Sequence, residues 1–130
     1  MNRRSFLTVT AAALLAASTQ VQAKSGRVEQ IIALTGSGKG KARYRVDSPT
    51  KRTFTVEVEK LRSLAGQTLN VIVISGATTT QVTSLRISSY GTGKVERKTE
   101  RGHSVPMIVA GDIVELRLAT DNTLVQSGQF

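Results

Sequence analysis

Polar and apolar residues alternate with a period of two along most of the chain, and glycine-containing turns interrupt the alternation. The pattern is clearest over residues 41–46 and 54–59. Alternation puts successive side chains on opposite faces of a strand, so that one face can be buried. Short strands at regular spacing, with no amphipathic helix between them, are typical of sandwiches and barrels. The sequence therefore predicts a single all-β domain, an antiparallel β-sandwich or small barrel of about 7–8 strands.

The apolar runs and the turns between them place the expected elements along the chain. The expected strands cover residues 28–34, 42–46, 54–58, 68–74, 82–88, 94–99, 105–109, 113–118 and 123–126. Residues 60–66 predict one helical turn that ends at Gly66 in the left-handed conformation. The apolar faces predict a core that contains Tyr44, Phe54, Val56, Val58, Leu69, Val71, Val73, Leu85, Val114, Leu116 and Leu118.

The first 23 residues predict a cleaved export signal rather than part of the fold. Arg3 and Arg4 form a positive head, and an apolar stretch of 13 residues follows over 6–18. This length fits a signal core of roughly 7–15 residues and is too short for a membrane span of about 20. Ala23 is a small residue directly before Lys24, and it predicts cleavage between Ala23 and Lys24. The mature domain then covers residues 24–130.

The positive head also resembles a known export motif. The run Arg3-Arg4-Ser5-Phe6-Leu7 resembles the twin-arginine motif, although Asn2 and Thr8 depart from its pattern. An ordinary secretory signal that starts with two arginines is the alternative. Both routes lead out of a bacterial cytoplasm, so we expect a periplasmic or secreted protein whose mature chain has no integral membrane segment.

Composition excludes several classes of chemistry. The 130 residues contain no Cys and a single His. The chain therefore has no disulfide scaffold, thiolate nucleophile, zinc ribbon or iron–sulfur site. We expect no metal and no cofactor. The pair Asp121-Asn122 predicts a tight turn rather than a calcium site.

Three groups of residues invite a catalytic interpretation, and each has a simpler one. The glycine-rich run 36–41 lacks the spacing of a phosphate-binding loop. His103 lies in an expected loop, and Asp112 is the carboxylate that could orient it. Glu57 and Glu59 share a strand face, where we expect cross-strand pairs with Arg43 and Lys41, respectively, rather than a glycosidase site. The sequence therefore predicts no catalytic residue and a non-enzymatic protein.

The basic surplus is the remaining chemical signal. The formal net charge is +9, and the densest group of cations covers 94–101. Its members Lys94, Arg97, Lys98 and Arg101 are the candidate anion-binding residues. Alternation puts Arg97 on the face opposite Lys94 and Lys98. A strand edge rich in Lys and Arg also deters pairing with another chain, which is the simpler interpretation. Tyr90, in a glycine turn, is the aromatic residue that we expect to be exposed.

Several runs together resemble a known group of proteins. These are residues 40–44, 56–59, 102–106 and 111–117. They resemble a group of small, uncharacterised exported bacterial all-β domains, and the resemblance covers most of residues 34–130. It implies an all-β export product and provides no catalytic residue.

Two functions remain open at this point. The first is a structural or protein-interaction module of the cell envelope that contacts its partners through a sheet edge or a loop face. The second is a cationic module that binds anionic glycan, lipid head groups or nucleic acid, including an oligonucleotide-binding-like barrel. Only the second should lose its hold on the envelope as salt rises.

The signal interpretation makes a direct prediction. The chain recovered from the periplasm or the medium should begin at Lys24, because cleavage should follow Ala23. Intact-mass measurement of the exported product checks this. A soluble cytoplasmic product that retains Met1 would contradict it.

Overall fold

The computed structural model describes residues 19–24 and 27–130 as one antiparallel sheet of nine strands with two short 3-10 helices. The strands are β1 (Thr19–Lys24), β2 (Arg27–Gly36), β3 (Lys39–Ser48), β4 (Lys51–Glu59), β5 (Thr68–Ser75), β6 (Thr78–Arg86), β7 (Gly93–Lys98), β8 (Ile113–Leu118) and β9 (Leu124–Gln129). The 3-10 helices are η2 (Arg62–Leu64) and η3 (Thr99–Arg101). The predicted all-β antiparallel class is confirmed.

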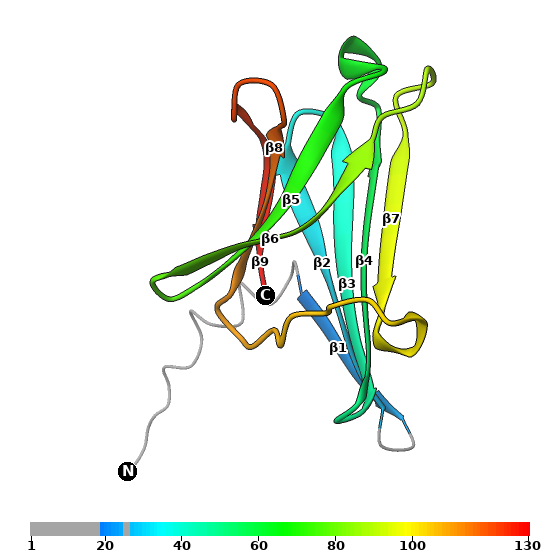
Figure 1. Cartoon of the computed structure of the whole chain (residues 1–130), viewed down its shortest axis with the longest axis vertical. Helices are drawn as coiled ribbons and strands as arrows, with labels where there is room; N and C mark the ends of the chain where they lie inside the picture. The colour runs from blue at the N-terminus through cyan, green and yellow to red at the C-terminus, as the bar shows by residue number, and fades with distance from the viewer. Residues whose placement is uncertain (1–18, 25–26) are drawn as a thin grey trace.

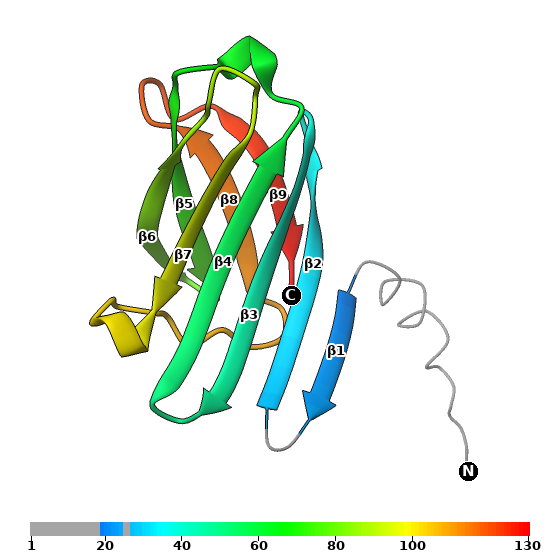
Figure 2. The same cartoon turned by 90° about the vertical axis from the view of Figure 1, so that its right-hand side faces the viewer.

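The sheet folds back on itself into a barrel-like shape with two layers. Its strand order is β6-β5-β8-β9-β2-β3-β4-β7, and β1 pairs with β2 beside this path. Figure 2 shows β1, β2, β3, β4 and β7 in front, with β9, β8, β5 and β6 behind. The end strands β6 and β7 lie next to each other along one side (Figure 1), with no ladder among the described residues.

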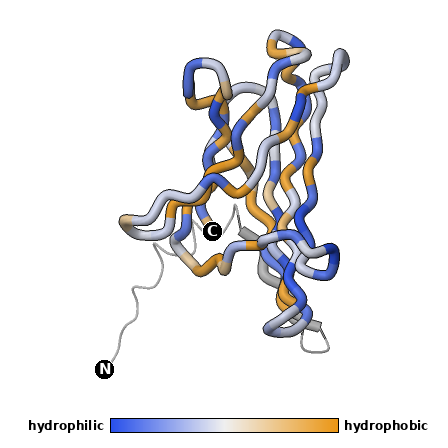
Figure 3. The backbone as a smooth tube through the Cα atoms, in the orientation of Figure 1, coloured by the Kyte–Doolittle hydropathy of each residue, from blue (hydrophilic) through white to orange (hydrophobic). Residues whose placement is uncertain are grey.

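The core lies between the two layers, where the apolar faces of the strands meet. Apolar and polar segments alternate along the tube in Figure 3, as the period of two requires. Every core residue expected from the sequence is buried except Leu118, which is partly buried. The same core also takes in Ile32, Leu34, Leu61, Ile87 and Val125.

The two layers are joined at a seam between β2 and β9. Thr35 and Gly36 pair with Ser127 and Gln126, and the Ser37 N–H donates to the Val125 carbonyl over 3.0 Å. The Gln126 side chain is only 1% exposed and donates through Nε2 to the Ser37 carbonyl over 2.6 Å. The seam is therefore a backbone ladder with one buried side-chain amide across it.

The predicted β3–β4 hairpin is confirmed, but its expected register is wrong by two residues. Ala42 lies opposite Val56, and Tyr44 lies opposite Phe54. Pro49 and Thr50 form a two-residue turn, and the register shifts once more at Asp47. A register difference of two residues changes the partner of each side chain without changing its face.

The expected strand over residues 105–109 is also wrong, because this segment is a loop. Pro106 has no N–H to donate to a ladder. The Val105 carbonyl instead accepts a bond of 2.9 Å from Arg52 Nη2, and the Val109 N–H donates to Asp112 Oδ2 over 3.0 Å. Side chains therefore satisfy backbone groups that a strand would have paired. By contrast, the expected turn at Gly66 is confirmed, with η2 before it and a φ of 81°.

Replacing Gly36 by alanine should destabilise the fold through the seam. Gly36 has a φ of 137°, and a methyl group there would collide with the Val125 carbonyl. Gly66→Ala is the matched control, since Gly66 also has a positive φ but nothing lies within 4 Å of its would-be methyl group. We expect the control to lose about 1–2 kcal/mol and Gly36→Ala to lose about 1–3 kcal/mol more through overpacking. Urea denaturation measures both, and equal losses would mean that the seam tolerates the methyl group.

Candidate functional site

Charged side chains line the outer face of β3, β4 and β7, and several of them form ion pairs. Lys41 Nζ lies 3.9 Å from Glu57 Oε2, Arg43 Nε lies 3.6 Å from Glu29 Oε2 and Arg45 Nε lies 3.3 Å from Asp47 Oδ2. Such partly exposed pairs contribute about 0.2–1 kcal/mol each. The expected pairs of Glu57 with Arg43 and of Glu59 with Lys41 are therefore wrong, because the hairpin register puts Lys41 beside Glu57, and Arg43 pairs with Glu29 instead.

These charged side chains also cover part of the sheet. Thr53 and Thr55 lie on the outer face of β4, yet both are buried. They have Arg45 and Arg43 opposite on one side, with β7 on the other. Long charged side chains can lay their apolar stems over a sheet while keeping their heads in water. We attribute the burial of the threonines to these neighbours, so the cations have a packing role besides any binding role.

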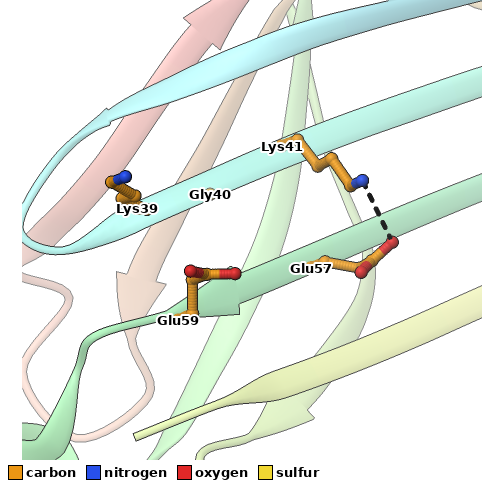
Figure 4. A pocket seen from close by; sticks show the side chains of 5 residues that line it. All are labelled: Lys39, Gly40, Lys41, Glu57 and Glu59. Carbon is orange, nitrogen blue, oxygen red and sulfur yellow. Dashed lines mark ion pairs between the residues drawn. The ribbon is translucent and has the colours of Figure 1, made fainter.

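One open hollow of about 240 Å³ lies on this face, lined by Lys39, Gly40, Lys41, Glu57 and Glu59. Figure 4 shows Lys41 and Glu57 joined across it, and Lys39 is the strand partner of Glu59. A glycosidase acid needs a carboxyl in an apolar, water-poor setting. Here Glu57 has a cation beside it, and its side chain is 37% exposed. The geometry therefore favours the structural interpretation of both carboxylates.

The structure does not bring the four candidate anion-binding residues together on one face. Lys94 and Lys98 lie on the outer face of β7, whereas Arg97 lies opposite Phe54 on the side of the core. Lys98 Nζ and Arg101 Nη1 each lie 3.8 Å from Glu96 Oε1. Lys94 makes no ion pair with any described residue. Of the four, Lys94 is therefore the cation most available to an anion.

His103 and Asp112 do not form a catalytic pair, because each is engaged elsewhere. His103 Nδ1 accepts the backbone N–H of Lys98 over 3.0 Å, which closes the turn at η3. A carboxylate that orients a catalytic histidine needs an N–H at that same nitrogen. Asp112 is buried and accepts the Val109 N–H. Both side chains act as local backbone acceptors.

The remaining acidic turn behaves as the sequence predicts. Asp121 Oδ1 accepts the Thr123 N–H over 3.0 Å, and hydrogen bonds from Thr123 hold the pKa of this exposed carboxyl below its usual value. Asn122 follows with a φ of 64°. Within residues 19–24 and 27–130, no group of three or more His, Asp or Glu side chains is arranged to hold a metal ion.

A second hollow, of about 520 Å³, lies between η2 and the loop after β6. It is lined by Glu59, Lys60, Arg62, Tyr90 and Thr92. Tyr90 is 75% exposed, as expected. Lys60 has a φ of 61°, which is rare outside glycine. Sequence reasoning picked out Tyr90 but missed the two cations, since residues 59–62 and 90–92 meet only through the fold.

The loop between η3 and β8 presents two exposed apolar side chains. Met107 is 73% exposed and Val109 is 57% exposed, whereas their neighbours Val105 and Ile108 are buried. The loop is held at both ends: Arg52 binds the Val105 carbonyl, and the Gly111 N–H donates to the Phe130 carbonyl over 2.7 Å. Sequence reasoning missed this surface because it expected a strand there.

Comparisons with known proteins add no relative. No family model matches the chain, and no curated protein or solved structure is detectably similar to it. Within the part of the chain that the structure describes, no helix is long and apolar enough to cross a membrane.

The placement of Lys94 predicts how the chain should behave on an anionic polymer. Lys94/Lys98→Gln should reduce retention on heparin more than Lys41/Arg43→Gln does. Both double variants remove two charges, but Lys41 and Arg43 are both ion-paired, whereas Lys94 is not. The salt dependence of retention should fall with the first variant, because fewer counterions are then released on binding.

Salt-gradient elution from heparin measures this difference, and Tyr90→Ala tests the second hollow in the same experiment. Equal losses from the two double variants would mean that only net charge matters. Failure of the unmodified chain to bind at modest salt would contradict anion binding altogether.

Proposed function

We propose that the chain is an exported, non-enzymatic module of the bacterial cell envelope that binds protein partners. The observation that carries this proposal is the loop that exposes Met107 and Val109. Exposed apolar side chains that stand together are typical of protein interaction sites, and methionine is enriched in them. The twin-arginine-like signal over residues 1–23 supports periplasmic or secreted placement.

The loop is suited to recognition because its backbone is tied down. The Arg52 guanidinium bridges the Pro49 and Val105 carbonyls over 2.8 and 2.9 Å, which links the β3–β4 turn to the loop. Gln129 Nε2 also donates to the Gly111 carbonyl over 3.0 Å. A loop that is ordered before binding loses less conformational entropy when a partner docks. Met107 and Val109 are thus presented on a rigid support.

A second candidate function rests on the hollow at Tyr90. An exposed ring beside Lys60 and Arg62 could stack on a sugar or base while the cations bind its acidic groups. Glu59 lines the same hollow and opposes anions. The hollow therefore supports binding of an anionic glycan or nucleic acid less strongly than the loop supports a protein partner.

Envelope retention of loop variants tests the first proposal. Met107→Ser combined with Val109→Ser should release the exported protein from the envelope fraction at low salt, because the apolar contact is lost. The unmodified protein should stay bound when salt rises from roughly 50 to 500 mM, since apolar contacts are not screened. Immunoblotting of washed envelope fractions measures both.

Leu124→Ser is the control for the loop variant, because Leu124 is also exposed but lies at the start of β9. It should behave like the unmodified chain. If high salt releases the unmodified protein and the loop variant stays bound, the protein-partner proposal is wrong and the anion-binding candidate is favoured.

A further inference from the structure

Strand β2 changes partner along its length, and its lower half depends on β1. On one side, residues 28–34 pair with β3. On the other side, Thr35 and Gly36 pair with β9, while residues 27–32 pair with β1. Figure 2 shows β1 as the outermost strand of the front layer. Without β1, the lower half of β2 would be an open sheet edge.

Export would remove β1. All of β1 except Lys24 lies before the cleavage point after Ala23, so the processed chain lacks the strand that covers β2. This step rests on the proposed export. The backbone N–H and C=O groups of residues 27–32 that pair with β1 would then be unpaired, and such an edge accepts another strand readily.

The exposed part of β2 lacks two of the usual protections of an edge strand, a proline and a β-bulge. Residues 27–34 contain no proline, and their pairing with β3 runs without a register shift. This part of β2 carries Arg27 and Glu29, one charge of each sign, whereas edge strand β7 carries Lys94, Glu96 and Lys98 on its outer face. Val28 remains 39% exposed even with β1 in place. The β2 edge therefore has no proline or bulge that would block pairing, and its two opposite charges can match those of another strand.

We propose that the processed chain dimerises through antiparallel pairing of its β2 edge with β2 of a second copy, centred on Val28. Two-fold symmetry requires a residue at the centre to lie opposite itself. Centring on Val28 puts Arg27 opposite Glu29 of the second copy, twice. Opposite charges in such positions stabilise a strand pair, and like charges destabilise it.

Neighbouring registers lack this complementarity. Centring on Arg27 or on Glu29 puts two like charges directly opposite each other, and centring on Gln30 leaves Glu29 opposite Ile31. Only the Val28 register pairs both charges and covers the exposed valine at once. Glu29 already lies 3.6 Å from Arg43, so its carboxylate would sit between two guanidinium groups. While β1 is present, it occupies the same edge and prevents the pairing.

Cysteine cross-linking tests the register directly, because the natural chain has no Cys. Val28→Cys in the exported, processed chain should form a disulfide-linked dimer, since directly opposed residues have Cα atoms about 4.5–5.5 Å apart. Ala33→Cys is the matched control on the same strand. In the proposed register the two Ala33 positions are roughly 34 Å apart, at about 3.4 Å per residue. We expect roughly tenfold more cross-linked product from Val28→Cys under mild oxidation.

Sedimentation of cysteine-free variants gives a second, independent measurement. The processed chain should sediment as a dimer, and the full chain held in the cytoplasm with β1 intact should be a monomer. Glu29→Arg should abolish the dimer by opposing like charges. Arg27→Glu combined with Glu29→Arg should restore it, because the swap re-forms both pairs.

Intact mass separates the two ways in which the inference can fail. The dimer is overturned if the product starts at Lys24 but sediments as a monomer, and if Val28→Cys yields no more cross-linked product than Ala33→Cys. A product that retains β1 overturns the inference at the export step. A Val28→Cys adduct with a different protein shows that the edge accepts a foreign strand, which also overturns the second copy as its occupant.

Discussion

The whole arrangement depends on strand β2, which pairs with β3 in the front layer and with β9 in the back layer. Its upper end joins β9 through two ladder pairs, the Ser37–Val125 bond and the buried Gln126 amide, and this gives the sheet a nearly closed, barrel-like shape. The close approach restricts what can stand at the seam. A side chain at Gly40 would collide with the Gln126 side chain, and one at Gly36 would collide with the Val125 carbonyl. The backbone ladder and the Gln126 amide therefore join the layers, and Gly36 and Gly40 leave room for that close approach.

Below the seam β2 no longer pairs with β9. The surfaces that are available for a ligand or partner are found on the outer face of the front layer, in the loops and at the sheet edges. The front layer has a charged outer face, but many of its cations form ion pairs with carboxylates. Some of them also lie over the buried threonines of β4. Surface pairs of this kind add little stability and lower the charge that is free for a ligand. Loops and edges are what remain for recognition: the segment with Met107 and Val109, the hollow at Tyr90 and the edge of β2. The loop and the hollow lie outside the sheet ladders, whereas the edge of β2 is paired with β1 and would be open only after the proposed cleavage.

The strand pattern was predictable because a period of two is a local property. Residues 41–46 and 54–58 show which face is apolar, and burial of Tyr44, Phe54 and Val56 confirms it. The register was not predictable, since it depends on the turn at Pro49 and on the irregularity at Asp47. The strand predicted over residues 105–109 was wrong for a related reason. Its apolar residues resemble a strand, but Arg52 and Asp112 capture its backbone from elsewhere in the chain.

The sequence by itself determined the fold class, the faces of the strands and part of the core, because hydrophobic burial acts on patterns within a few residues. It also excluded thiol and disulfide chemistry through its lack of cysteine. Only the tertiary structure decided which cations have partners, which aromatic ring meets Lys60 and Arg62, and which strand covers the edge of β2. Those contacts join residues that are distant in the chain, so they depend on register and closure rather than on local alternation.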